Sequence, residues 1–303
     1  MRSLANYGYT HVITTTRQEL DLRDQVAVNA WFARYRPQYV FVAAGTVGGI
    51  LANMSRPAEF LYDNLLIHGN VVHAAYSTGV TKLLYLGSSC MYPRDAAQPV
   101  NEKVLLTGPL ESTNEPYAIA KIAGVKLCQA YRKQYGCDFI SAVPTNVYGP
   151  NDNFDLSSSH VVPAMMRKFH DAKASGASTV TLWGSGAPRR ELLHVDDLAD
   201  ACVFLMRAYS DVLHVNVGTG TDIAIRDLAE LVREIVYPAA RIEFDTSKPD
   251  GIPRKLLNVD RLHALGWRHR TDLRQGLAAT YSWFLEQLGA TSAARSGASR
   301  RAT

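Results

Sequence analysis

The chain has 303 residues, of which 47% are hydrophobic and 20% are charged, and its formal net charge is +4. This composition is typical of a globular protein with one large or two modest cores, and it argues against intrinsic disorder. The mild excess of positive charge comes partly from arginines at the two ends of the chain rather than from a basic face. We therefore expect no nucleic-acid partner.

The cysteines lie at positions 90, 128, 137 and 202, without paired spacing or a His-rich companion cluster. We expect neither a metal site nor a disulfide framework. No signal peptide is recognisable, and the longest apolar stretch, residues 39–52, is too short and too rich in glycine to span a bilayer. The simplest interpretation is a cytoplasmic protein without a membrane partner.

The first residues predict the second half of a helix over 1–8 and a strand over 11–14. A doubly wound fold places a first strand and a glycine-rich turn before such a helix, because the helix N-terminus binds the pyrophosphate of the cofactor. No Gly-x-x-Gly-x-x-Gly precedes residue 11. We therefore expect that the printed start omits about 20 residues of a βαβ opening. The competing hypothesis is a truncated protein, in which loss of the first strand would separate the strand pair before residue 45 from the rest of the sheet.

Further along the chain, helical periodicity alternates with short apolar runs, which is typical of a parallel sheet covered by helices. The helices are predicted over 25–36, 58–79, 115–135, 161–174, up to about 209, 225–236 and 271–288, and the strands over 39–44, 83–86, 139–143, 180–183 and 213–217. We expect an α/β fold, a Rossmann-like doubly wound parallel sheet, with a smaller C-terminal α/β substrate domain. The expected domains are 1–150, with a return over about 185–220, and 151–288, followed by a disordered tail over 289–303.

The most informative stretch runs from the strand over 83–86 to the helix that starts near residue 115. Ser88 and Cys90 follow the buried strand, where ligands bind in open parallel sheets. Tyr117 and Lys121 are four residues apart, so they share one face of the predicted helix. A nearby ammonium favours a tyrosinate, so this Tyr is suited to exchange a proton with a carbonyl or hydroxyl oxygen. Together these residues resemble the Ser-Tyr-Lys triad of the short-chain dehydrogenase/reductase superfamily.

Several longer motifs resemble the GDP-L-fucose synthase family. They are Val-Gly-Gly-Ile at 47–50, Gly-Ser-Ser-Cys-Met-Tyr-Pro at 87–93, Thr-Asn-Glu-Pro-Tyr-Ala-Ile-Ala-Lys at 113–121, Pro-Thr-Asn-Val-Tyr-Gly-Pro at 144–150, Ser-His at 159–160, Trp-Gly at 183–184, Arg190, His-Val-Asp-Asp at 194–197 and Ser-Lys-Pro-Asp-Gly at 247–251. The resemblance covers residues 4–288. It implies epimerisation of GDP-4-keto-6-deoxy-D-mannose at carbons 3 and 5, then NADPH-dependent reduction at carbon 4 to GDP-L-fucose.

The chemistry accounts for the residue types. The ketone at carbon 4 acidifies the protons on carbons 3 and 5, so inversion needs a base on one face and an acid on the other. The resemblance implies that Cys90 and His160 are the two groups that act as this base and this acid. Tyr117 would protonate the carbon 4 oxygen during reduction, Ser88 would hydrogen-bond that oxygen, and Lys121 would lower the pKa of Tyr117 and hold the nicotinamide ribose.

The resemblance also implies contacts to cofactor, substrate and a second subunit. The expected NADP(H) contacts are Arg17, Ala43, Ala44, Leu86, Gly87, Ser88, Ser89, Lys121, Pro144, Thr145, Asn146, Val147 and His160. The expected GDP-sugar contacts are Lys168, Trp183, Arg190 and Asp250. Arg17 follows the predicted strand over 11–14, where an Arg suits the 2′-phosphate of NADP. A homodimer is expected through the helices over 58–79 and 115–135.

Two departures from the family pattern leave alternatives open. Thr46 stands where the family usually has a basic residue, and Lys168 keeps the charge but not the bidentate geometry of an Arg. One alternative is another nucleotide-sugar enzyme of this fold, a 4,6-dehydratase or a 4-epimerase. A dehydratase needs an acidic pair after its catalytic Ser or Thr, and the chain has Ser89 and Cys90 instead. The other alternative is a non-catalytic remnant that binds GDP-sugar. We expect this chain to bind NADPH more weakly than a chain extended by the missing opening.

Overall fold

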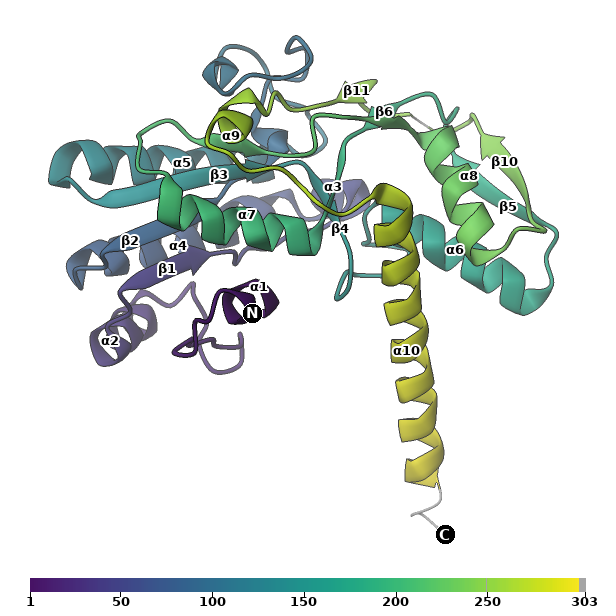
Figure 1. Cartoon of the computed structure of the whole chain (residues 1–303), viewed down its shortest axis with the longest axis horizontal. Helices are drawn as coiled ribbons and strands as arrows, with labels where there is room; N and C mark the ends of the chain where they lie inside the picture. Colours follow the sequence, from purple (N-terminus) through teal and green to yellow (C-terminus); the bar gives the residue numbers. More distant parts are fainter. Residues whose placement is uncertain (249, 300–303) are drawn as a thin grey trace.

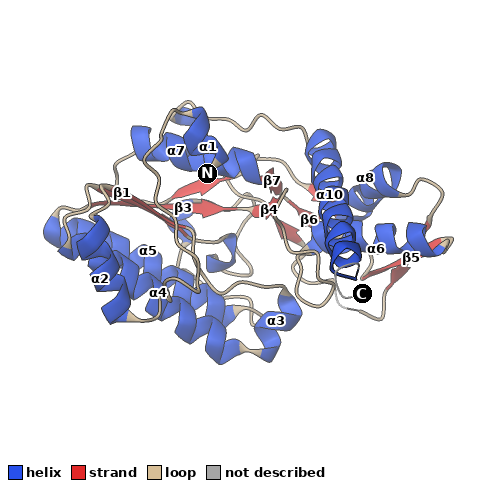
Figure 2. Ribbon diagram, turned by 90° about the horizontal axis from the view of Figure 1, so that it is seen from below, coloured by secondary structure: helices blue, strands red, loops and turns tan. Residues whose placement is uncertain are grey.

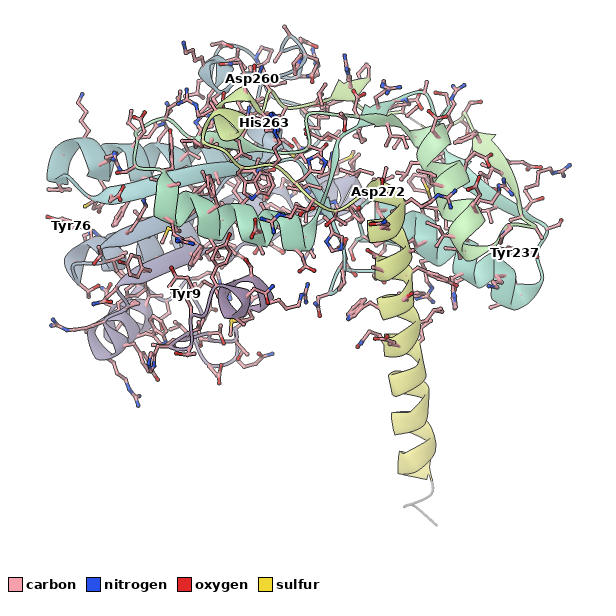
Figure 3. All side chains as sticks on the ribbon, in the orientation of Figure 1. Tyr9, Tyr76, Tyr237, Asp260, His263 and Asp272 are labelled. Carbon is pink, nitrogen blue, oxygen red and sulfur yellow. The ribbon has the colours of Figure 1, made fainter. Side chains whose placement is uncertain are left out.

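The computed structural model describes residues 1–248 and 250–299. It consists of two lobes, with the C-terminal helix α10 projecting from the junction between them (Figure 1). Tyr76, on α4, and Tyr237, just after α8, lie at opposite ends of the molecule (Figure 3). The long axis therefore runs from one lobe to the other.

The first lobe is built on a parallel sheet of four strands in the order β1-β2-β3-β8. Its strands are β1 (Tyr39–Val42), β2 (Lys82–Leu86), β3 (Asp138–Pro144) and β8 (Val215–Val217). Its helices are α1 (Arg2–Asn6), α2 (Gln25–Tyr35), α3 (Ile50–Ser55), α4 (Pro57–Ser77), α5 (Glu115–Tyr135), α7 (Val195–Ala208) and α9 (Asp260–Ala264). Figure 2 shows α2, α4 and α5 on one face of this sheet and α7 with α1 on the other. The α/β fold with a parallel sheet predicted from the sequence is confirmed.

The second lobe has its own apolar core, to which α6, α8 and α10 contribute. Its helices are α6 (Val161–Ser175), α8 (Ile225–Val236) and α10 (Leu273–Ser299), and its strands β5 (Thr179–Trp183) and β10 (Arg241–Asp245) pair in parallel. Short strands join the lobes: β4 (Asn146–Tyr148) with β7 (Leu192–His194), and β6 (Arg189–Arg190) with β9 (Ile223–Ala224) and β11 (Arg254–Lys255). Segments far apart in sequence thus meet at the junction.

Helix α5 and strand β2 approach each other closely at Gly124. A Cβ at this position would lie 2.8 Å from Cε2 of Tyr85 and closer still to the ring Cζ and the hydroxyl oxygen. Tyr85 is fully buried in β2, and its hydroxyl lies 3.0 Å from Nδ1 of His68 on α4. Glycine at position 124 therefore allows α5 to pack closely against the sheet. At its other end α5 stops at Gly136, which adopts the left-handed conformation with φ of 71°.

The structure differs from the predictions at both ends of the chain. Residues 9–16 form no strand, although a strand was predicted over 11–14, and the edge strand β1 pairs only with β2. β1 nevertheless stays in the sheet by pairing directly with β2, so the expected separation of the strands before residue 45 does not occur for β1. The tail over 289–303 was predicted to be disordered. The described backbone is helical as far as Ser299, and residues 300–303 lie outside the described residues.

Asp272 starts α10 by accepting a hydrogen bond from the backbone N–H of Gln275 at 3.2 Å (Figure 3). The short helix α3 was not predicted from the sequence. Among the described residues, no helix is long and apolar enough to cross a membrane, and the same residues contain no cluster of His, Cys, Asp and Glu that could hold a metal ion.

We predict that Gly124→Ala destabilises the protein by about 1–3 kcal/mol, because the new methyl group overlaps the buried Tyr85 ring and forces α5 away from β2. Gly69→Ala on α4 is the matched control. A Cβ at 69 meets nothing within 4 Å, so the substitution should be neutral or stabilising by up to about 1 kcal/mol through helix propensity. Urea denaturation measures both values, and equal effects of the two substitutions would contradict the close packing at Gly124.

Candidate active site

The carboxyl ends of β1, β2 and β3 meet at one edge of the sheet, where open α/β folds bind their ligands. The loop after β1 is fixed there by Asn64 on α4. Its Nδ2 donates to the Thr46 carbonyl at 2.9 Å, and its Oδ1 accepts from the Thr46 N–H at 2.9 Å. A Cβ on Gly45 would lie 2.8 Å from Oδ1 of Asn64 and 3.7 Å from Nζ of Lys121. A side chain at position 45 would therefore crowd the Asn64 amide oxygen, whereas its distance to Lys121 would be an ordinary van der Waals contact.

Ser88 and Tyr117 meet at the end of β2. The Ser88 side chain accepts a hydrogen bond from the Cys90 N–H at 3.3 Å and is hydrogen-bonded to Tyr117. Burial raises the pKa of Tyr117, the nearby Cys90 raises it further, and the Ser88 bond only partly offsets these effects. The Tyr117 hydroxyl is therefore protonated at neutral pH and is suited to donate a proton to an oxygen in the crevice.

Lys121 lies one turn after Tyr117 on α5 and is 4% exposed. Its Nζ donates to the Leu86 carbonyl at 2.9 Å and lies 5.9 Å from the centre of the Tyr117 ring. Burial lowers the pKa of Lys121 to about 8. Burial has the largest effect on the pKa of both groups, and its net effect on Tyr117 is to raise the pKa. That Lys121 lowers the pKa of Tyr117 stays a prediction.

Cys90 lies just past the end of β2, in the short 3-10 turn Ser89–Met91. Its Sγ accepts hydrogen bonds from Nδ2 of Asn114 at 3.4 Å and from Nζ of Lys255 at 3.3 Å. Burial by itself would raise the pKa of the thiol, but the Lys255 ammonium and the bonds from Ser88, Lys255 and Asn114 hold this pKa below its usual value. Cys90 therefore carries more thiolate than an ordinary cysteine, as a useful base requires.

His160 is the N-cap residue of α6, and its side chain is exposed. The loop before it packs on the glycine-rich segment after β1, since the Gly49 N–H donates to the Ser158 carbonyl at 3.0 Å. Burial raises the pKa of Asp152, and the nearby His160 offsets this rise in part. The structure thus brings Ser88, Cys90, Tyr117 and Lys121 together, whereas His160 comes to this edge on a separate loop.

The residues predicted to hold GDP-sugar lie at two places in and beside the second lobe. Lys168 and Trp183 adjoin each other, because the Lys168 Nζ lies 5.6 Å from the centre of the Trp183 ring and donates to the Thr181 carbonyl at 3.0 Å. Burial lowers the pKa of Lys168. Trp183 remains 54% exposed, with Lys248 also 5.8 Å from its ring centre. An exposed indole flanked by two cations is suited to a base and a phosphate.

Arg190 and Asp250 form the second place. The Arg190 Nη1 donates to the Ile252 carbonyl at 2.7 Å, and burial lowers the pKa of its guanidinium, although Asp250 and Cys90 act in the opposite direction. The Asp250 carboxylate accepts from the backbone N–H and the hydroxyl of Ser185 at 2.6 and 2.7 Å, and these bonds lower its pKa. Cys90 is close enough to affect the pKa of Arg190, so this second place lies near the Cys90 thiol.

The predicted cofactor contacts fall into two groups. Those at the carboxyl edge of the sheet lie in the last residue of a strand or just after β1, β2 or β3, namely Ala43, Ala44, Leu86, Gly87, Ser88, Ser89, Pro144, Thr145, Asn146 and Val147. Thr145 and Asn146 both donate to the Glu191 carbonyl, at 3.3 and 3.0 Å, which joins this edge to the second lobe. Arg17 is the exception, because it is exposed on a turn over 17–19 and follows no strand.

Three residues of the site were missed by the sequence interpretation. Asn114 and Lys255 contact the Cys90 sulfur, and Lys248 lies over Trp183. Asn114 lies within a motif already noted and could have been found from it. Lys255 could not, because it reaches Cys90 from a two-residue strand 165 positions later in the chain.

The comparisons with known proteins agree with this geometry. Residues 1–218 match the model of the NAD dependent epimerase/dehydratase family. The chain therefore belongs to this family of enzymes, as the resemblance to the wider superfamily predicted. It is similar over nearly its whole length to enzymes named GDP-L-fucose synthase.

The Arabidopsis thaliana GDP-L-fucose synthase 1 is 54% identical over 288 residues, 95% of this chain and 89% of that protein. The Escherichia coli K12 GDP-L-fucose synthase is 53% identical over 294 residues, 94% of this chain and 92% of that protein. A crystal structure of a GDP-L-fucose synthetase from Naegleria fowleri bound to NADP superposes with a TM-score of 0.88 at 27% identity, covering 95% of this chain and 90% of that one.

Lys121 provides a test of the site through stability. Its pKa of about 8 lies below the ordinary lysine value of 10.5, so the folded state binds fewer protons than the unfolded state between these two pH values. The lysine thus costs up to about 3 kcal/mol of stability below pH 8, and the cost disappears as the pH rises towards 10.5.

We predict that Lys121→Met is more stable than the parent protein at pH 7 and loses this advantage by about pH 10. The exposed Lys133→Met on the same helix is the control and should follow the parent at every pH. Urea denaturation across this range measures the difference. A constant difference between Lys121→Met and the parent would contradict the assigned burial of the ammonium.

Proposed function

We propose that this protein is a GDP-L-fucose synthase, which inverts carbons 3 and 5 of GDP-4-keto-6-deoxy-D-mannose and reduces carbon 4 with NADPH. The observation that carries the proposal is the placement of Cys90 beside the Ser88–Tyr117 pair, with the thiol held partly ionised by Lys255. A 4,6-dehydratase would need an acidic pair where Ser89 and Cys90 stand, so we do not favour it. The high identity to named synthases supports the same choice.

The nicotinamide end of NADPH fits the described residues. Gly45 leaves open the space beside Lys121 that a Cβ would occupy, and Lys121 has an ammonium facing the end of β2. We propose that Lys121 holds the nicotinamide ribose, and that the residues after β1, β2 and β3 line the cofactor. When bound, NADPH supplies a hydride to carbon 4 of the sugar. Arg17 is exposed and free to approach a 2′-phosphate, which suits NADP rather than NAD.

The residues of the chain divide the proton transfers between them. Cys90, as a thiolate, takes a proton from the carbon next to the ketone, and His160 provides the acid on the opposite face. Ser88 and Tyr117 hydrogen-bond the carbon 4 oxygen while charge develops on it. In the reduction Tyr117 donates its proton to the same oxygen, as its raised pKa permits. The carbon 4 carbonyl, bound by Ser88 and Tyr117, is therefore used in both the epimerisation and the reduction.

We further propose that Lys168 and Arg190 bind the pyrophosphate side of the substrate, that Trp183 stacks on a ring of it, and that Asp250 accepts hydrogen bonds from it. The two lobes then correspond to a cofactor domain, 1–150 with a return over 185–220, and a sugar-nucleotide domain over 151–288. The cysteines are all free, and a thiol that acts as a base requires a reducing compartment, which supports a cytoplasmic location.

Two variants separate the two reactions. Tyr117→Phe should lower NADPH oxidation by about 100-fold or more, since a positioned proton donor is lost. It should lower solvent deuterium exchange at carbons 3 and 5 by less, because Ser88 still hydrogen-bonds the carbon 4 oxygen. Cys90→Ser should lose the exchange. Mass spectrometry of the sugar nucleotide in D₂O measures exchange, and NADPH absorbance measures reduction. Equal loss of both activities in both variants would contradict the division of roles.

We also propose a homodimer formed through α4 and α5, which pack side by side along one face of the sheet (Figure 2). Large apolar side chains are exposed on both helices, including Tyr62 and Leu65 on α4 and Ile119 on α5. Light scattering should give twice the chain mass for the parent, and Leu65→Glu should shift it towards the monomer because it places a charge in the interface. A monomeric parent protein would overturn this arrangement.

A further inference from the structure

The two short strands β6 and β11 place four cations in a fixed order at the junction of the lobes. They pair in parallel, with Arg189 opposite Arg254 and Arg190 opposite Lys255. Successive side chains on a strand point to opposite faces. One face therefore carries the first pair, Arg189 and Arg254, and the other carries the second pair, Arg190 and Lys255.

Asp222 holds the first pair. Nε of Arg189 donates to its Oδ1 at 2.8 Å, and Nε of Arg254 donates to its Oδ2. The carboxylate side chain is only 5% exposed, and the two arginines hold its pKa below the usual value although burial alone would raise it. A single buried carboxylate bridging both strands thus fixes which face of each strand turns inward.

The second pair, Arg190 and Lys255, lies near the Cys90 thiol. The Lys255 Nζ donates to the Cys90 Sγ at 3.3 Å, and no carboxylate forms an ion pair with Lys255 among the described residues. Asn114 approaches the same sulfur at 3.4 Å. A cavity of about 20 Å³ adjoins this group and is lined by Cys90, Asn114 and Lys255 among others. This volume holds about one water molecule, and both Cys90 and Lys255 are partly buried.

We propose that Lys255 keeps Cys90 ionised for the epimerisation, and that Asp222 is the positioning residue that aims Lys255 at the sulfur. This inference rests on the proposed function. During the step the bond between carbon and hydrogen breaks, the proton bonds to the Cys90 sulfur, and the electron pair moves to the ketone oxygen held by Ser88 and Tyr117. The lysine transfers no proton and acts only through its charge.

Other charged or titratable groups also face Cys90. Tyr117 approaches it from α5 and Arg190 from β6, and Arg94 and Glu111 line the adjoining cavity from the loops after β2. Of these groups, only Lys255 is hydrogen-bonded to the sulfur and positively charged. Its removal should therefore change the ionisation of Cys90 more than the removal of any of the others.

The test measures the rate of iodoacetamide alkylation of Cys90 against pH, with peptide mapping to separate the cysteines. Cys128 and Cys202 are buried and burial raises the pKa of both to about 12, so they serve as unreactive references. Lys255→Met should slow alkylation of Cys90 at pH 7 by about tenfold and move its profile to higher pH. Lys255→Arg should keep most of the rate, and the exposed Lys173→Met should match the parent.

Asp222→Asn should move the Cys90 profile in the same direction as Lys255→Met but by less, because Lys255 remains present and loses only its alignment. Superimposed profiles of Lys255→Met and the parent would overturn the proposal. If Lys255→Met fails to fold, Cys128 and Cys202 become reactive and reveal it, and the profile of Asp222→Asn then decides in either direction. Alkylation needs no substrate, so a failure of the proposed function, seen as absent deuterium exchange in the parent, is distinguishable from a failure of this inference.

Discussion

The contact between Gly124 on α5 and Tyr85 on β2 is the constraint on which the site depends. It lets a long helix lie directly on the central strands, so the first turns of α5 come level with the end of β2. Tyr117 and Lys121 then face Ser88 and the Leu86 carbonyl. The Tyr85 hydroxyl is also hydrogen-bonded to His68 on α4, so this buried contact connects α4 to the site. A larger residue at 124 would displace these groups together.

Burial sets the electrostatics of these groups more than their mutual charges do. Burial raises the pKa of Tyr117 and lowers the pKa of Lys121 to about 8, because each group leaves water for the interior. Cys90 behaves differently from these two residues. Its burial would raise the pKa of the thiol, but the Lys255 ammonium and the hydrogen bonds from Ser88 and Asn114 lower this pKa by more. The same crevice thus holds a protonated acid and a partly ionised base a short distance apart, which two successive reactions at one ketone require.

The sequence predicted much of this arrangement. Buried strands read as apolar runs, and helices α5 and α8 have the predicted bounds because their apolar period and end residues agree. The grouping of Ser88, Cys90, Tyr117 and Lys121 followed from one strand and the helix after it. These features are local in sequence, so pattern reasoning can reach them.

What the sequence did not predict can also be traced to particular residues. The strand over 11–14 was predicted from its composition, but a strand forms only where a neighbour offers hydrogen bonds. The spacing of Tyr117 and Lys121 did not indicate how deeply Tyr117 is buried, and this burial has the largest effect on its pKa. Lys255 was missed because its contact with Cys90 depends on the pairing of two-residue strands. Long-range pairing and burial are properties of the folded chain.

The measurement that tests the account most directly is product identification by NMR after this 303-residue protein is incubated with GDP-4-keto-6-deoxy-D-mannose and NADPH. The account predicts GDP-L-fucose, inverted at carbons 3 and 5 and reduced at carbon 4, with one NADPH oxidised per product molecule. A product reduced at carbon 4 without either inversion would contradict the role given to Cys90. Recovery of unchanged substrate would contradict the proposal that the crevice described here is a working active site.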